Sequence, residues 1–86
     1  MIFINHYRIK EGKRDEVIKR RLEIGRKEPK GTKIIGEWSA MSGNQGFLIF
    51  ETDKPDFSWT LIWSDLLDME VIPVFDTDKD VMGLLK

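Results

Sequence analysis

The strongest turn signal of the chain lies in residues 42–46, which read Ser-Gly-Asn-Gln-Gly, between two runs of strand-forming residues. Glycine and asparagine tolerate the left-handed backbone conformations that tight turns require. The preceding run, residues 32–41, contains two isoleucines and Trp38. The following run, residues 47–51, reads Phe-Leu-Ile-Phe-Glu. Two such runs joined by a short turn predict an antiparallel β-hairpin. The fold of this chain must therefore accommodate a hairpin at its centre.

A further strand is predicted for residues 2–9, where side chains alternate between two faces. One face carries Ile2, Ile4, His6 and Arg8, and the other carries Phe3, Asn5, Tyr7 and Ile9. Both faces are partly apolar, so the alternation alone does not say which of them lies against the core. His6, the one histidine of the chain, is interpreted as a structural or exposed residue.

Two helices and a last strand complete the pattern. A charged segment from Gly12 to about Lys27 has one apolar arc, formed by Val17, Ile18, Leu22 and Ile24. A second helix is expected to start at residues 53–55, where proline suits the first turn, and to end near Asp68. The last strand is expected at residues 71–75, with Pro73 indicating an edge or a bulge. A short terminal helix would then follow, with Val81, Met82 and Leu84 on its apolar side.

This order of elements predicts an α+β domain that spans residues 1–86 as a single unit. A βαββαβ chain with right-handed crossovers closes into a four-stranded antiparallel sheet with two helices on one face, as in a ferredoxin-like fold. We expect the uncovered face to carry Phe3 and Tyr7 together with one face of the later strands. Because a monomer rarely exposes so large an apolar surface, the sequence predicts a homodimer that pairs sheet to sheet.

The charges of the chain are strongly divided. Residues 1–33 hold eleven basic and five acidic side chains, net +6, and residues 34–86 hold three basic and ten acidic ones, net −7. The near-zero total argues against a nucleic-acid partner and permits contact between copies of the chain. No apolar run is long enough for a membrane span, and there is no cysteine. We therefore expect a cytoplasmic protein with no membrane partner and no metal site.

Three segments carry a resemblance to a known family: residues 31–38 with Gly36-Glu-Trp38, residues 47–55 with Glu51-Thr-Asp-Lys-Pro55, and residues 63–74. In this order and spacing they resemble a family of small bacterial and archaeal domains of unknown function assigned to the dimeric α+β barrel group. The resemblance implies a fold and a dimer, and it implies no activity. The wider group contains cofactor-free monooxygenases, haem-degrading enzymes and small-molecule binders.

Asn5 and Tyr7 are the first pair of candidate binding residues. Asn5, Ile9 and Gly12 have the spacing N-x-x-x-[I/L]-x-x-G, which is similar to the first strand of some haem-degrading members, where the asparagine faces the substrate. An amide and a phenol on one face of a strand suit a polar contact with a ligand inside a dimeric barrel. The alternative is that both groups form hydrogen bonds across the dimer interface, because buried polar groups require partners.

The three tryptophans are the second group of candidates. Trp59 and Trp63 are one helical turn apart and would lie along one flank of the second helix. Such a wall suits a flat aromatic ligand. An ordinary core is the commoner use of indoles at this spacing, and we expect at least one of the tryptophans to belong to the core. Trp38 and Trp63 are the preferred ligand contacts because both lie in the segments that carry the family resemblance, whereas the orientation of Trp59 stays open.

These observations lead to one principal functional hypothesis with two alternatives. The principal one is a homodimeric domain that binds a small apolar or aromatic molecule through Asn5, Tyr7, Trp38 and Trp63, or that serves as an accessory dimer, with no cofactor. The first alternative is a cofactor-independent monooxygenase in which the same pocket orients an electron-rich substrate. The second is an RNA-binding sheet, because residues 46–50 resemble an RNA-stacking strand. No catalytic residue is assigned.

Overall fold

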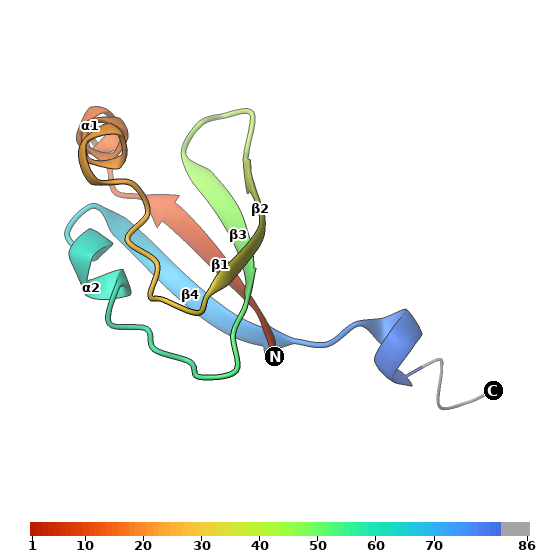
Figure 1. The fold of residues 1–86 in the computed structure, drawn as a ribbon. Coiled ribbons are helices and arrows are strands. Elements are labelled where there is room, and N and C mark those ends of the chain that lie inside the picture. Colours follow the sequence, from red (N-terminus) through yellow and green to blue (C-terminus); the bar gives the residue numbers. More distant parts are fainter. Residues whose placement is uncertain (82–86) are drawn as a thin grey trace.

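The computed structural model describes residues 1–81 and shows one four-stranded antiparallel sheet with helices beside it (Figure 1). The sheet has the strand order β2-β3-β1-β4. The elements follow one another as β1 (Ile2–Ile9), α1 (Arg14–Ile24), β2 (Lys33–Ser39), β3 (Gln45–Glu51), α2 (Thr60–Trp63), β4 (Leu67–Val74) and η1 (Thr77–Val81). The predicted α+β class and the four antiparallel strands are thus confirmed.

The central hairpin forms as the turn signal predicts. Strands β2 and β3 pair antiparallel, and Gly43 in their connection has a φ of 76°, the left-handed region that favours glycine. The Gly43 amide donates to the Ala40 carbonyl at 2.8 Å, and the Ala40 amide donates to the Gln45 carbonyl at 2.9 Å. A register shift lies between Ile34 and Gly36 of β2. The hairpin supplies one half of the sheet.

Strand β4 lies at the sheet edge, as Pro73 predicts, but it begins earlier than expected. It pairs with the whole of β1, from Ile9 opposite Leu67 to Ile2 opposite Val74. This pairing takes the backbone of residues 67–70 into the sheet and leaves them unavailable to a helix. The predicted last strand at residues 71–75 is therefore corrected to Leu67–Val74.

The second helix is much shorter than predicted. Only Thr60–Trp63 is helical, and turns occupy much of the expected helix around it. The Asp56 carboxylate accepts a hydrogen bond from the Ser58 amide at 3.0 Å, a local turn that competes with helical hydrogen bonding.

The first helix is also shorter than predicted. It spans Arg14–Ile24 and ends at Gly25, whose φ is 71°. Of the predicted terminal helix, Val81 lies in η1, whereas Met82 and Leu84 lie outside the described residues.

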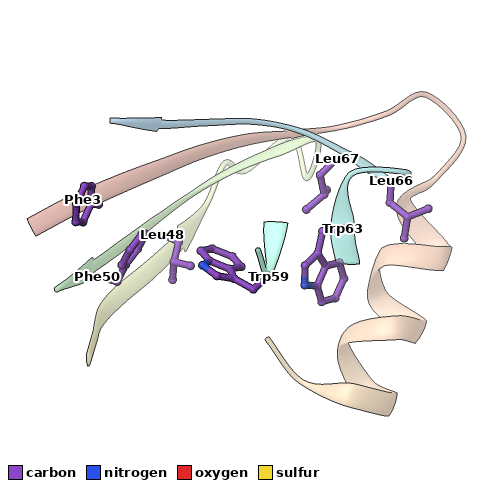
Figure 2. Packing of buried hydrophobic residues seen from close by; sticks show 7 residues of the cluster. All are labelled: Phe3, Leu48, Phe50, Trp59, Trp63, Leu66 and Leu67. Carbon is purple, nitrogen blue, oxygen red and sulfur yellow. The ribbon is translucent and has the colours of Figure 1, made fainter. Parts of the chain in front are cut away.

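The core lies between the sheet and α2, on one side of the strands (Figure 2). The buried apolar side chains are Phe3, Leu48, Phe50, Trp59, Trp63, Leu66 and Leu67. Phe3 and Asn5 are both buried, and Tyr7 packs against the same cluster. The expectation that Phe3 and Tyr7 lie on the uncovered face is therefore wrong. The uncovered face is the one that carries Ile2, Ile4, His6 and Arg8, because the aromatic cluster takes the opposite face into the core.

Candidate functional site

A cavity of about 510 Å³ lies between the inner face of the sheet and α1. Its size falls within the range of small-molecule sites. Strand residues form its floor, α1 forms one wall, and the two indoles of Trp59 and Trp63 form another. The floor residues include Asn5, Tyr7, Ile9, Glu37, Leu48, Leu67 and Met69. The cavity therefore combines a mainly apolar lining with a few polar side chains.

Helix α1 covers this cavity without packing tightly into it. Within the described residues, α1 buries none of its side chains. Of its predicted apolar arc, Leu22 is 81% exposed and Ile18 is 47% exposed, although both line the cavity. An amphipathic helix normally places such residues against a core. The apolar side of α1 thus faces an unfilled space.

Polar contacts tie α1 to the rest of the domain. The Arg20 guanidinium donates to both carboxylate oxygens of Asp65, at 2.7 and 2.9 Å, and to the Ile62 carbonyl at 2.6 Å. It also lies 5.7 Å from the centre of the Trp63 ring. The hydrogen bonds from Arg20 lower the pKa of Asp65 to about 2. These hydrogen bonds from Arg20 connect α1 to the segment around α2.

A second polar cluster is centred on Glu37 of β2. Its carboxylate accepts hydrogen bonds from Arg21 of α1, at 2.8 and 3.2 Å, and from Arg26 in the following loop at 3.0 Å. The Tyr7 hydroxyl donates to the same carboxylate at 2.6 Å. Four separate segments, β1, β2, α1 and the loop after α1, therefore meet at one carboxylate.

The surroundings of this cluster shift its protonation equilibria. Burial raises the pKa of Glu37, but the hydrogen bonds from Arg21 and Tyr7 and the charge of Arg21 outweigh it, so the pKa lies below its ordinary value. Burial, followed by the hydrogen bond to Glu37 and its negative charge, raises the pKa of Tyr7 to about 12. Glu37 is thus ionised and Tyr7 protonated at neutral pH, and Tyr7 acts as a donor.

Two residues that line the cavity each hold a buried polar atom without a partner. Asn5 is 2% exposed and Trp59 is 6% exposed, and both line the cavity. In the described part of the chain, neither the Asn5 Oδ1 atom nor the Trp59 Nε1 atom has a hydrogen-bond partner. Because an unsatisfied buried polar group costs about 1–3 kcal/mol, such atoms require an explanation. A bound molecule that supplies the missing partners is one such explanation.

Three of the four predicted binding residues meet at this cavity. Asn5, Tyr7 and Trp63 line it, and the Trp63 indole is anchored by a 3.1 Å hydrogen bond to the Arg26 carbonyl. Trp38 lies elsewhere: it pairs with Phe47 on the uncovered face, where it is 57% exposed. The structure thus separates Trp38 from the other three.

The sequence pattern did not point to Glu37 or to the arginines of α1, and it left the orientation of Trp59 open. The spacing of Trp59 and Trp63 was a usable signal for the indole wall, but it did not show which indole lacks a partner. Glu37 stands within the segment that carries the family resemblance, yet its three donors come from distant parts of the chain. Its role could be seen only once those segments were brought together.

Among residues 1–81, no group of three or more histidine, cysteine, aspartate or glutamate side chains is arranged to hold a metal ion. No helix in that range combines the length and the apolar character needed to cross a membrane.

Comparison with known proteins places the whole chain in one family. Residues 1–86 match the model of a family described as a domain of unknown function (DUF3303). Neither the curated proteins nor the solved structures yield a match. The expected likeness to a family of domains of unknown function is thereby confirmed.

Proposed function

Because the chain belongs to this family of domains of unknown function, we propose from its own geometry that it is a binding protein for a small, largely apolar molecule. The ligand occupies the cavity between the sheet and α1. The observation that carries this proposal is that two residues of the cavity lining, Asn5 and Trp59, each hold a buried atom without a partner, Oδ1 and Nε1. A ligand that bonds to them would also cover the apolar side of α1.

The geometry favours binding over catalysis. Tyr7 is held protonated and Glu37 is ionised between two guanidinium groups, so neither is poised to exchange a proton near neutral pH. Trp63 donates its indole hydrogen to a backbone carbonyl. The polar groups of the cavity that are already paired therefore position the walls, and the unpaired ones are left for the ligand.

An Asn5→Leu variant tests the proposal, since leucine is similar in size and apolar. Removing an unsatisfied buried amide should raise the free energy of unfolding of the ligand-free protein by about 1 kcal/mol. Binding of hits from an aromatic and apolar ligand panel should weaken at the same time. The matched control is Trp38→Phe, on the uncovered face, which should leave binding unchanged.

Thermal shift and ligand-observed NMR measure both effects. A variant that loses stability while it binds hits as the wild type does would overturn the proposal, because Asn5 would then serve only the fold. Absence of any hit for the wild-type protein would overturn it as well. Oxygen consumption with a quinol-type substrate would point instead to the monooxygenase alternative.

We further propose that two copies pair through the uncovered sheet face, completing a ferredoxin-like dimeric α+β barrel. The βαββαβ order and the β2-β3-β1-β4 sheet support this fold. Ile4 lies between Ile49 and Ile72 at the centre of the face. Trp38 and Phe47 lie side by side in the next row of the same face, and the His6 ring stacks on Phe47 with 4.6 Å between centroids.

The exposed area supports a second copy as the occupant. The chain exposes 6420 Å², whereas a compact monomer of 10.1 kDa is expected to expose about 5300 Å². The chain is thus less compact than a typical monomer of its mass, which leaves surface for a second copy to cover. Arg8 and Lys33 on this face are outnumbered by Glu51, Asp68 and Glu70, which favours another copy over RNA.

Light scattering tests the dimer. Wild-type protein should have about twice the mass of one chain, Ile49→Glu should be monomeric, and Leu61→Glu, which places the same charge on an exposed residue of α2, should stay dimeric. A monomeric wild type would overturn the dimer and leave the cavity proposal standing. Salt-sensitive binding of an oligonucleotide that Trp38→Ala abolishes would favour the RNA alternative.

A further inference from the structure

We infer that the ligand is a small organic carboxylate with a flat apolar body, an inference that rests on the proposed binding function and specifies its ligand. The cavity lining holds three arginines, Arg14, Arg21 and Arg26. Among the described residues that form this lining, Glu37 is the one carboxylate. The lining therefore carries a net charge of about +2 if each ionised side chain counts as one unit.

The Glu37 cluster does not neutralise this charge. Arg21 and Arg26 share one carboxylate, at 2.8 and 3.0 Å, so one positive charge of the cluster remains uncompensated. Glu37 also accepts the Tyr7 hydrogen bond, and its capacity to accept further donors is largely used. A guanidinium group prefers a planar, bidentate oxygen partner, and a ligand carboxylate supplies one.

Arg14 adds a charge at the rim of the cavity. It stands in the first turn of α1, and its guanidinium lies against Gly43 in the turn between β2 and β3, where a Cβ atom would be 3.0 Å from Nη2. No ion pair of Arg14 is found within residues 1–81. Arg14 thus holds an uncompensated charge between the helix and the hairpin, beside the cavity.

The unpartnered atoms agree with an acidic ligand. The Trp59 indole can only donate a hydrogen bond, so if a small shift of the ring opens its buried Nε1 atom to the cavity, the matching ligand group is an acceptor. The Asn5 side chain can turn either its oxygen or its nitrogen toward a ligand. The apolar body of the ligand would lie among Leu48, Met69 and the indoles. An anion with an apolar ring satisfies the donors and the apolar walls together.

The test compares 2-naphthoate with 2-naphthamide, which share a shape and differ in charge. Ligand-observed NMR titration of the full chain should show naphthoate binding at least about fivefold more tightly, as expected for a charge-assisted contact. Arg14→Gln should remove most of that preference by weakening naphthoate binding far more than amide binding. Lys19→Gln removes the same charge from α1 at an exposed position outside the cavity lining and should preserve the preference.

The outcomes separate this inference from the proposed function. Equal binding of the two probes, or an equal effect of Arg14→Gln and Lys19→Gln, would overturn the carboxylate and leave the cavity as a binding site for neutral molecules. Absence of binding by both probes would overturn the carboxylate inference, and the proposed function would then depend on the Asn5→Leu result with the wider panel. A preference for naphthoate that fades with added salt would support the inference.

Discussion

The Tyr7 side chain reaches across the intervening strand β3 to donate a 2.6 Å hydrogen bond to Glu37 of β2. Gly46 of β3 lies opposite Tyr7 in the sheet register, and a Cβ atom at Gly46 would collide with the phenol ring. The absence of a side chain at Gly46 thus lets the ring lie flat over the strand. This contact joins β1 to the arginine cluster that holds α1 over the cavity.

Tyr7→Phe removes the hydroxyl and keeps the ring. Because the lost hydrogen bond has a charged acceptor, we expect the free energy of unfolding to fall by about 1–2 kcal/mol. Urea unfolding followed by circular dichroism measures the change. An unchanged transition midpoint would show that water replaces the phenol at Glu37 without cost.

Gly46→Ala should destabilise the domain by about 1–3 kcal/mol, since the new methyl group displaces the Tyr7 ring from β3. The same substitution in a Tyr7→Ala background should cost much less, because the ring is then absent. A double-mutant cycle from urea unfolding gives the coupling between the two positions. Additive effects would contradict the close contact.

Tyr7 is the only tyrosine of the chain, so its ionisation can be followed directly by phenolate absorbance. The midpoint should lie near 12, well above the ordinary value of 10.0, because burial and Glu37 raise the pKa. Glu37→Gln should lower that midpoint by removing the negative charge. A wild-type midpoint near 10.0 in protein that is still folded would contradict the contact.

The same shift predicts a change in alkaline stability. The raised pKa means that the folded state holds the Tyr7 proton more tightly than the unfolded state does. Its stabilising contribution is therefore complete below 10.0 and is lost as the pH rises toward about 12. Tyr7→Phe should flatten this part of the stability profile, measured by urea unfolding at a series of alkaline pH values. Parallel profiles for the two proteins would refute the linkage.

The lowered pKa of Glu37 predicts a corresponding loss of stability in acid. Its pKa is lower in the folded than in the unfolded state, so its contribution is present above the ordinary value of 4.5 and is lost as the pH falls through the folded pKa. Glu37→Gln should therefore be less stable at neutral pH and lose less stability on acidification. Equal slopes of stability against pH for both proteins would show that other carboxylates, such as Asp65, control acid unfolding.

The strands were the most predictable part of the fold. Alternation in residues 2–9 depends only on local side-chain order, and β1 has the predicted bounds. The second helix was predicted too long because the apolar residues after Trp63 are compatible with a helix as well as with a strand. Leu67 pairs with Ile9, which is far away in the sequence. Because of that pairing, the chain from Leu67 onward forms strand β4 and not the end of a helix.

The candidate site was only partly predictable. Asn5, Tyr7 and Trp63 were identified by type and position, and all three line the cavity. Trp38 was predicted as a ligand contact on the same grounds, but it lies on the uncovered face. Nothing local distinguishes Trp38 from Trp63, because each is an indole in an apolar segment.

The sequence by itself determined the first three strands, the presence of a fourth, the central turn, the α+β class and the membership of the family. Periodicity and turn chemistry are properties of neighbouring residues, so they can be read without knowing the fold. Only the tertiary structure decided which face of β1 the core covers, since both faces carry apolar side chains and the position of α2 selects one. It also decided that Glu37 meets Tyr7, Arg21 and Arg26, because that cluster depends on contacts between segments far apart in the chain.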